Sequence, residues 1–237
     1  MIPGLELYAC GVMLSRLVYL PNDGPLPMRK SSVLALSQLL VLFFVYPWQS
    51  AVWWTGAVLM IISLVAYQFE NAARIRLGIR VFTLLLQLLV PASMFWYLGP
   101  VEVRPWTLNI PVLALLASLG ILVLANEANY LIRLLFVWCH LEPKLPGKAD
   151  VNNAEKVDEE EYKAGRVIGM LERALIFLII FFVNDFAAVG FILAAKGLIR
   201  IQQTKDRQFS EYMLIGTLAS TIFAVIIALV LQPFSIN

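Results

Sequence analysis

Long apolar stretches, separated by short polar breaks, run through most of the chain. A helix that crosses the hydrocarbon core of a bilayer needs about 20 mostly apolar residues, with a range near 17–25. Seven stretches approach that length and are predicted to be transmembrane helices: Val33–Trp48, Ala51–Gln68, Arg80–Leu98, Thr107–Asn126, Val167–Asn184, Phe186–Arg200 and Glu211–Leu231. The first and the sixth are short, which implies tilt or local thinning of the bilayer. The pattern predicts an all-α, polytopic transmembrane bundle of about seven spans.

The N-terminal stretch Leu5–Leu20 is apolar enough to enter lipid, but it is short and contains Glu6 and Arg16. Two interpretations follow. In the first, which we favour, it is an interfacial or re-entrant helix that does not cross the bilayer. In the second it is a full span, and the chain then has eight transmembrane helices.

The spacing of the apolar stretches divides the chain into four parts. Residues 1–32 form the N-terminal helix and loop, 33–140 a four-helix half, 141–165 an acidic cytoplasmic linker and 166–237 a three-helix half. Four consecutive acidic residues lie near the end of the linker: Asp158, Glu159, Glu160 and Glu161. We interpret them as a solvated, acidic helix start; the alternative is a docking surface for a basic partner protein.

Lysine and arginine are distributed unevenly between alternate loops. Cytoplasmic loops are enriched in these residues. When the loop before Val33 is placed inside, Arg104 is the one basic residue assigned to an outside segment. Tryptophans support the same orientation, because an aromatic belt is typical of the membrane boundary, and five fall near the outer one: Trp48, Trp53, Trp54, Trp96 and Trp106. The N-terminus is therefore predicted to be cytoplasmic and the C-terminus periplasmic.

Composition excludes several classes of protein. Hydrophobic residues make up 60% of the chain and charged residues 14%, whereas soluble domains average roughly 45–50% and about 25%. A soluble enzyme, a secreted disulfide scaffold and a nucleic-acid-binding module all fit poorly. The sequence has two cysteines and one histidine, too few for a typical zinc site. It contains no phosphate-binding loop or nucleophile elbow, so we expect no metal, no cofactor and no catalytic residues, and we lean against an enzyme.

Charged side chains within a span are costly and point to function. Glu172, Arg173 and Lys196 are such residues, and an ion pair between Glu172 and Lys196 is geometrically available because their helices form a hairpin. Glu172 shares a helix face with Gly165 and Gly169, a pattern that allows close packing of helices.

Three interpretations of these charges stay open. They are a structural pair with snorkelling cations, a polar site for an ion, proton or small substrate, or a basic step for an anionic lipid headgroup. Further candidates for headgroup or surface contact are Arg200, Lys205 and Arg207, and secondary polar candidates are Asn184, Asp185, Glu211 and Tyr212. Asn126, Glu127 and Asn129 are expected to be solvated where the fourth span leaves the membrane.

The C-terminal third carries a family resemblance. The run from Gly165 to Arg173, then Gly190 to Lys196, and finally Glu211 to Ser220 resembles the bacterial membrane-protein family described as domain of unknown function 3307. The resemblance implies a bacterial inner-membrane protein and implies no activity. It draws attention to Glu172, Arg173, Lys196, Glu211 and Tyr212. The His and Asp residues of that family's N-terminal helices have no counterparts here, so no metal or acid–base role carries over.

The sequence thus predicts a non-enzymatic membrane component that binds a protein partner or a lipid, with no nucleic acid involved. The alternative is a small transporter or channel that uses Glu172, Arg173 and Lys196.

Overall fold

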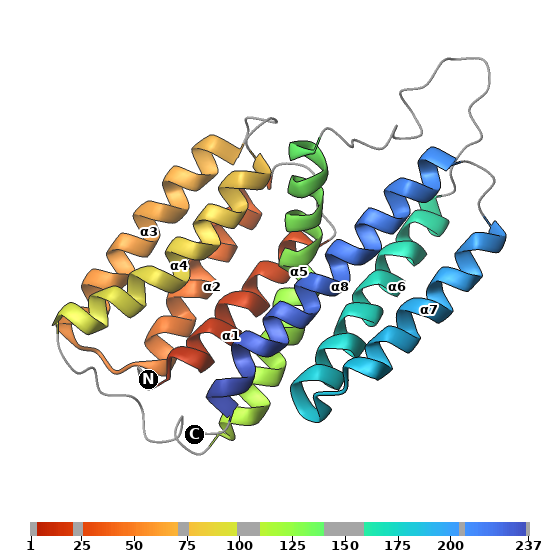
Figure 1. Ribbon diagram of the computed structural model, residues 1–237. Coiled ribbons are helices and arrows are strands. Elements are labelled where there is room, and N and C mark those ends of the chain that lie inside the picture. The colour runs from red at the N-terminus through yellow and green to blue at the C-terminus, as the bar shows by residue number, and fades with distance from the viewer. Residues whose placement is uncertain are drawn as a thin grey trace, which may run out of the picture. The chain divides into compact units, whose positions relative to one another are not determined.

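The protein is helical wherever its structure is described. The computed structural model describes residues 4–20, 26–70, 76–98, 110–139, 159–203 and 207–235, and these contain helices and turns but no strands. The helices are α1 (Leu5–Arg16), α2 (Met28–Val45), α3 (Ser50–Glu70), α4 (Arg76–Leu98), α5 (Val112–Trp138), α6 (Glu159–Leu178), α7 (Phe186–Gln203) and α8 (Arg207–Ser235), as labelled in Figure 1. Two short segments complete them: the 3-10 turn Leu17–Tyr19 and the π-helical Ile179–Val183. The predicted all-α class is confirmed.

Five helices in the described part of the chain are long and apolar enough to cross a membrane: Met28–Val45, Ser50–Phe69, Gly78–Tyr97, Val112–Trp138 and Leu214–Phe234. The two predicted spans absent from this set correspond to α6 and α7. The apolar part of α7, Phe186–Leu198, is too short to qualify, and α6 begins with several charged residues. The multi-pass membrane character is supported, whereas the count of seven is not confirmed.

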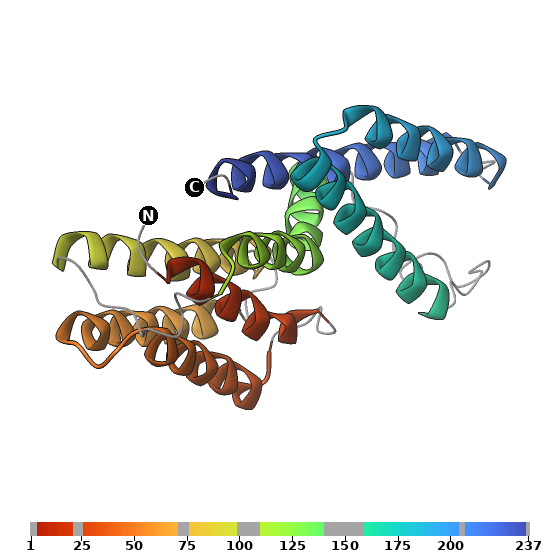
Figure 2. The same cartoon turned by 90° about the horizontal axis from the view of Figure 1, so that it is seen from below.

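The chain folds as two compact units, Met1–Leu131 and Ile132–Asn237, with the division inside α5. In unit 1, α1 has 12 residues, fewer than the roughly 17 needed for a span. It lies between α2 on one side and α4 and α5 on the other (Figure 2). Its Tyr8 and Val12 are fully buried and pack with Leu42 and Tyr46. α1 is therefore packed among the other helices of unit 1, and its predicted place in the membrane, interfacial or re-entrant, stays a prediction.

Unit 1 presents apolar side chains on its outer surface, as expected for lipid contact. Leu40 of α2, Ile61 and Leu64 of α3 and Phe82 of α4 are more than half exposed. Trp48, Trp53 and Trp96 are also exposed, and they lie where α2 ends, α3 begins and α4 ends. The Trp48 and Trp53 rings are 5.6 Å apart. The tryptophans therefore gather at one end of this unit, as an aromatic belt requires; Trp106 lies outside the described residues.

In unit 2, α6 packs along α8 (Figure 1). Phe177 and Ile180 are buried, as are Ala224 and Ala228 of α8. The turn into α7 begins at Asn184, which has a φ of 57°, and Asp185 Oδ1 accepts hydrogen bonds from the Ala187 and Ala188 amides at 2.9 and 3.2 Å. Asp185 is therefore the N-cap of α7.

Most of the described glycines in unit 2 do not lie at a close approach of helices, and these include Gly165, where the sequence predicts close packing. A Cβ atom placed on Gly165, Gly190 or Gly197 would meet no other atom within 4 Å. Gly216 of α8 is different, since its Cβ would lie 3.1 Å from Cζ of Phe136. In unit 2 a close approach at glycine therefore occurs at Gly216.

Candidate functional site

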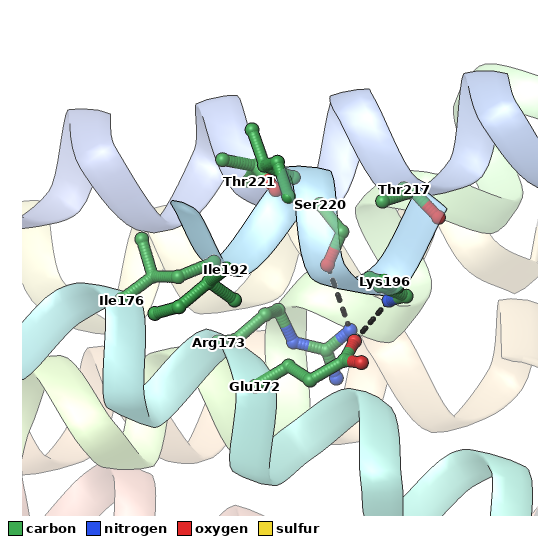
Figure 3. A pocket seen from close by; sticks show the side chains of 9 residues that line it. Glu172, Arg173, Ile176, Ile192, Lys196, Thr217, Ser220 and Thr221 are labelled. Carbon is green, nitrogen blue, oxygen red and sulfur yellow. Dashed lines mark hydrogen bonds and ion pairs between the residues drawn. The ribbon is translucent and has the colours of Figure 1, made fainter. Parts of the chain in front are cut away.

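Unit 2 brings together the three charged residues that the sequence singled out. Glu172 and Arg173 come from the middle of α6, and Lys196 comes from α7 (Figure 3). The Lys196 ammonium donates to Oε2 of Glu172, so the ion pair that the sequence made available is formed. Their side chains remain 18% and 26% exposed. The pair therefore lies at the open side of the site.

Arg173 lies deeper than this pair. The residue is 4% exposed, and its Nη1 donates to Oγ of Ser220 on α8 at 3.3 Å. A Cβ atom on Gly169, one turn earlier, would lie 3.7 Å from Nη1 of Arg173, an ordinary contact distance. The guanidinium therefore lies close to Gly169 of its own helix.

A small cavity lies among these groups. Its volume is about 10 Å³, which is room for about one water molecule. The lining combines three charged groups, three hydroxyls and three aliphatic side chains: Glu172, Arg173, Lys196, Thr217, Ser220, Thr221, Ile176, Ile192 and Leu193. With two cations and one carboxylate the site carries a formal charge of +1, so an anion is the ligand that it favours.

The remaining sequence candidates do not join this site in the described part of the chain. Asn184 and Asp185 lie in the exposed turn before α7. Asp158 and Lys205 lie outside the described residues. For a further set the structure describes the helical backbone alone: Arg200 in α7, Arg207, Glu211 and Tyr212 in α8, and Glu159, Glu160 and Glu161 in the first turn of α6. Their roles stay predictions.

Unit 1 contains a second polar centre that the sequence analysis did not identify. Arg16, at the end of α1, is fully buried. Its Nε donates to Oε1 of Glu127 on α5 at 2.7 Å, and its Nη1 donates to Oε1 of Gln87 on α4 at 3.2 Å. Gln87 in turn donates to Oε1 of Gln38 on α2 at 2.8 Å. One hydrogen-bonded network therefore joins α1, α2, α4 and α5.

This network corrects the expectation that Asn126, Glu127 and Asn129 are solvated at a helix end. Asn126 and Glu127 are each 1% exposed, because α5 continues to Trp138 and places them near its middle. Asn129 is partly buried, and its side chain donates to the Ala125 carbonyl. Arg80 of α4 is also buried, at 2% exposure. Its guanidinium carbon lies 4.4 Å from the centre of the Tyr19 ring.

The network also supplies hydrogen-bond partners for the C-terminal end of α1 within unit 1. The Arg16 carbonyl accepts from Nδ2 of Asn126 at 3.1 Å, and the Tyr19 carbonyl accepts from the Tyr130 hydroxyl at 2.8 Å. The two arginines place positive charge near the C-terminal end of this helix, where the helix dipole favours it. Buried backbone carbonyls that would otherwise lack partners are thus satisfied. This centre is best explained as the structural anchor of α1.

The sequence signal that could have revealed this buried polar centre is a pair of glutamines. Gln38 and Gln87 each interrupt the apolar core of a predicted span, and a polar residue there needs a partner.

Among the described residues no group of three or more His, Cys, Asp or Glu side chains could hold a metal ion. No family model matches the chain, and no curated protein or solved structure matches it either. The charged site of unit 2 and the buried network of unit 1 are therefore the basis for a proposed function.

Proposed function

We propose that this chain is a non-enzymatic, multi-pass membrane component that binds the phosphate of an anionic lipid at the charged site of unit 2. The observation that supports it is the nearly complete burial of Arg173 beside Lys196, which concentrates positive charge among apolar helices. Arginine binds phosphate through paired N–H donors and lysine binds it as a point charge. The Ser220 hydroxyl, already bonded to Arg173, adds a further polar contact.

The proposed location is the bacterial inner membrane, with a cytoplasmic N-terminus and a periplasmic C-terminus. The uneven distribution of lysine and arginine supports this orientation, and the resemblance of the C-terminal third supports the compartment. The short, enclosed α1 is proposed to be re-entrant, because its buried polar end has its partners within the unit and does not need water.

Lipid retention tests this function. We expect the protein, purified in mild detergent, to retain phosphatidylglycerol over phosphatidylcholine in native mass spectrometry. Arg173→Gln and Lys196→Gln should each lower that retention about tenfold or more, because a charge-assisted contact to phosphate is worth roughly 1.5–3 kcal/mol. The control is Arg29→Gln, which removes an exposed cation at the start of α2. Equal loss in all three variants would indicate a general charge effect and contradict the proposal.

The alternative, a small transporter or channel, is favoured by one observation: the cavity is lined by a carboxylate and three hydroxyls and has room for a water-sized occupant. One further variant separates the two functions. Transport predicts that Glu172→Gln abolishes flux in proteoliposomes, whereas lipid binding does not require this carboxylate.

The proposed seven-span topology has its own test in the turn between α6 and α7. If both helices cross the membrane, the turn is periplasmic; if they form a re-entrant hairpin, it is not. A reporter at Asn237 cannot distinguish these cases, because both return the chain to the same side. We expect Ala187→Cys, at an exposed position of α7 in a Cys139→Ser background, to react with a membrane-impermeant maleimide from the periplasmic side. Labelling only from the cytoplasmic side, or none, would overturn the seven-span count.

A further inference from the structure

Glu172 forms an ion pair with Lys196, which is one of the two cations that the proposed lipid phosphate needs. We propose that Glu172 is an internal competitor: its carboxylate takes the place of the phosphate while no lipid is bound, and lipid binding exchanges one anion for the other on Lys196. This inference rests on the proposed function and adds its regulation. The exchange is a change of noncovalent partners and needs no co-reactant.

The small free space beside the ion pair favours such an exchange. It is about 10 Å³, about one water molecule, so little room remains between the two cations while the Glu172 carboxylate lies there. Arg173 lies at the inner side with 4% exposure, while the Glu172 and Lys196 side chains are 26% and 18% exposed. Figure 3 shows the Glu172 carboxylate directed between Lys196 and Arg173. A phosphate that contacts both cations must therefore displace this carboxylate.

The partial exposure of the Glu172–Lys196 pair lowers the free-energy cost of displacing the carboxylate. A partly exposed ion pair can be reached by an incoming anion without separating the helices around it. The contrast with unit 1 is informative: the Arg16 and Glu127 side chains are 1% and 2% exposed, and opening that pair would leave each charge buried without an opposite charge. In the exchange at Lys196 the incoming phosphate replaces the carboxylate, so this cation is not left without an anion.

The test measures binding of fluorescent phosphatidylglycerol to the full chain in phosphatidylcholine nanodiscs. If Glu172 competes for Lys196, Glu172→Gln strengthens binding up to about fivefold, the equivalent of one partly exposed ion pair. Lys196→Gln and Arg173→Gln weaken it. Asp185→Asn, which removes an exposed carboxylate in the turn before α7, leaves it unchanged. A thermal melt of each variant confirms that the protein is folded.

The double variant Glu172→Gln/Lys196→Gln separates competition from simple charge repulsion. Competition for Lys196 predicts that the gain from Glu172→Gln disappears when Lys196 is absent, a coupling that a double-mutant cycle measures directly. A gain that persists in the Lys196→Gln background would overturn the exchange. So would unchanged or weaker binding in Glu172→Gln alone, and in both cases the proposed function still holds if Arg173→Gln weakens binding. Equal binding of phosphatidylglycerol and phosphatidylcholine by the unaltered protein, with no effect of Arg173→Gln, would overturn the proposed function itself.

Discussion

Replacing Arg16 with methionine is expected to cost about 3–5 kcal/mol of stability in unit 1, the usual cost of removing one partner from a buried ion pair. The pair has side chains 1% and 2% exposed, so Arg16→Met leaves the Glu127 carboxylate buried without its cation. The loss also removes the donors to Gln87 and to the Arg80 carbonyl.

Cys10 provides the measurement. It is buried in α1, whereas Cys139 is exposed, so a Cys139→Ser background leaves one thiol that reacts only when α1 opens. We expect Arg16→Met to speed the labelling of Cys10 about a hundred- to several thousandfold, the equivalent of 3–5 kcal/mol. Arg29→Met, at an exposed site, is the matched control.

The double variant Arg16→Met/Glu127→Met provides the decisive comparison. Replacing both members of a buried pair by apolar residues is often neutral or stabilising, so the double variant should recover most of the loss. If Arg16→Met alone changes the labelling rate less than about fivefold, the pair behaves like an exposed one, and the anchoring role assigned to it would be wrong.

The helices of this protein could be predicted from its sequence because their cause is local. Twenty apolar residues in a row specify a helix in lipid wherever the rest of the chain lies. This reasoning located α2, α3, α4, α5 and α8. It failed at the end of the fourth span, because Asn126 and Glu127 look like the end of an apolar stretch, whereas α5 continues past them to Trp138.

The two charged centres also differ in whether a local sequence pattern predicts them. Glu172 and Lys196 are 24 residues apart in one hairpin, so the turn between their helices predicts their contact. Arg16 and Glu127 are 111 residues apart, and each lies at the edge of an apolar stretch, where a charge is ordinarily solvated. Their contact depends on how α1 packs among three other helices, which no local pattern specifies. Gln38 and Gln87 indicated that a polar partner was needed there but not which one.

Gly11→Ala is expected to cost about 1–3 kcal/mol, as overpacking a tight interface does. Gly11 of α1 lies against Val41 of α2: its added Cβ would clash with Cγ1 and lie 2.9 Å from Cγ2 and 3.2 Å from Cβ. Valine is stiff about χ1, so the clash can be relieved only by moving a helix. The Cys10 labelling assay should detect this directly, because Cys10 precedes Gly11 in the same helix.

Gly56→Ala in α3 is the matched control for Gly11→Ala. Its added Cβ would lie 3.4 Å from Cδ2 of Leu39 and 3.6 Å from Cδ2 of Leu42, which are ordinary contact distances, and alanine is favoured over glycine inside a helix by about 0.5–1 kcal/mol. We therefore expect Gly11→Ala to lower the stability of unit 1 and Gly56→Ala to raise it. The double variant Gly11→Ala/Val41→Ala should regain part of the loss, because the smaller side chain at Val41 removes the clash. If Gly11→Ala is as mild as Gly56→Ala, α1 and α2 are not in the close contact on which the enclosed position of α1 depends.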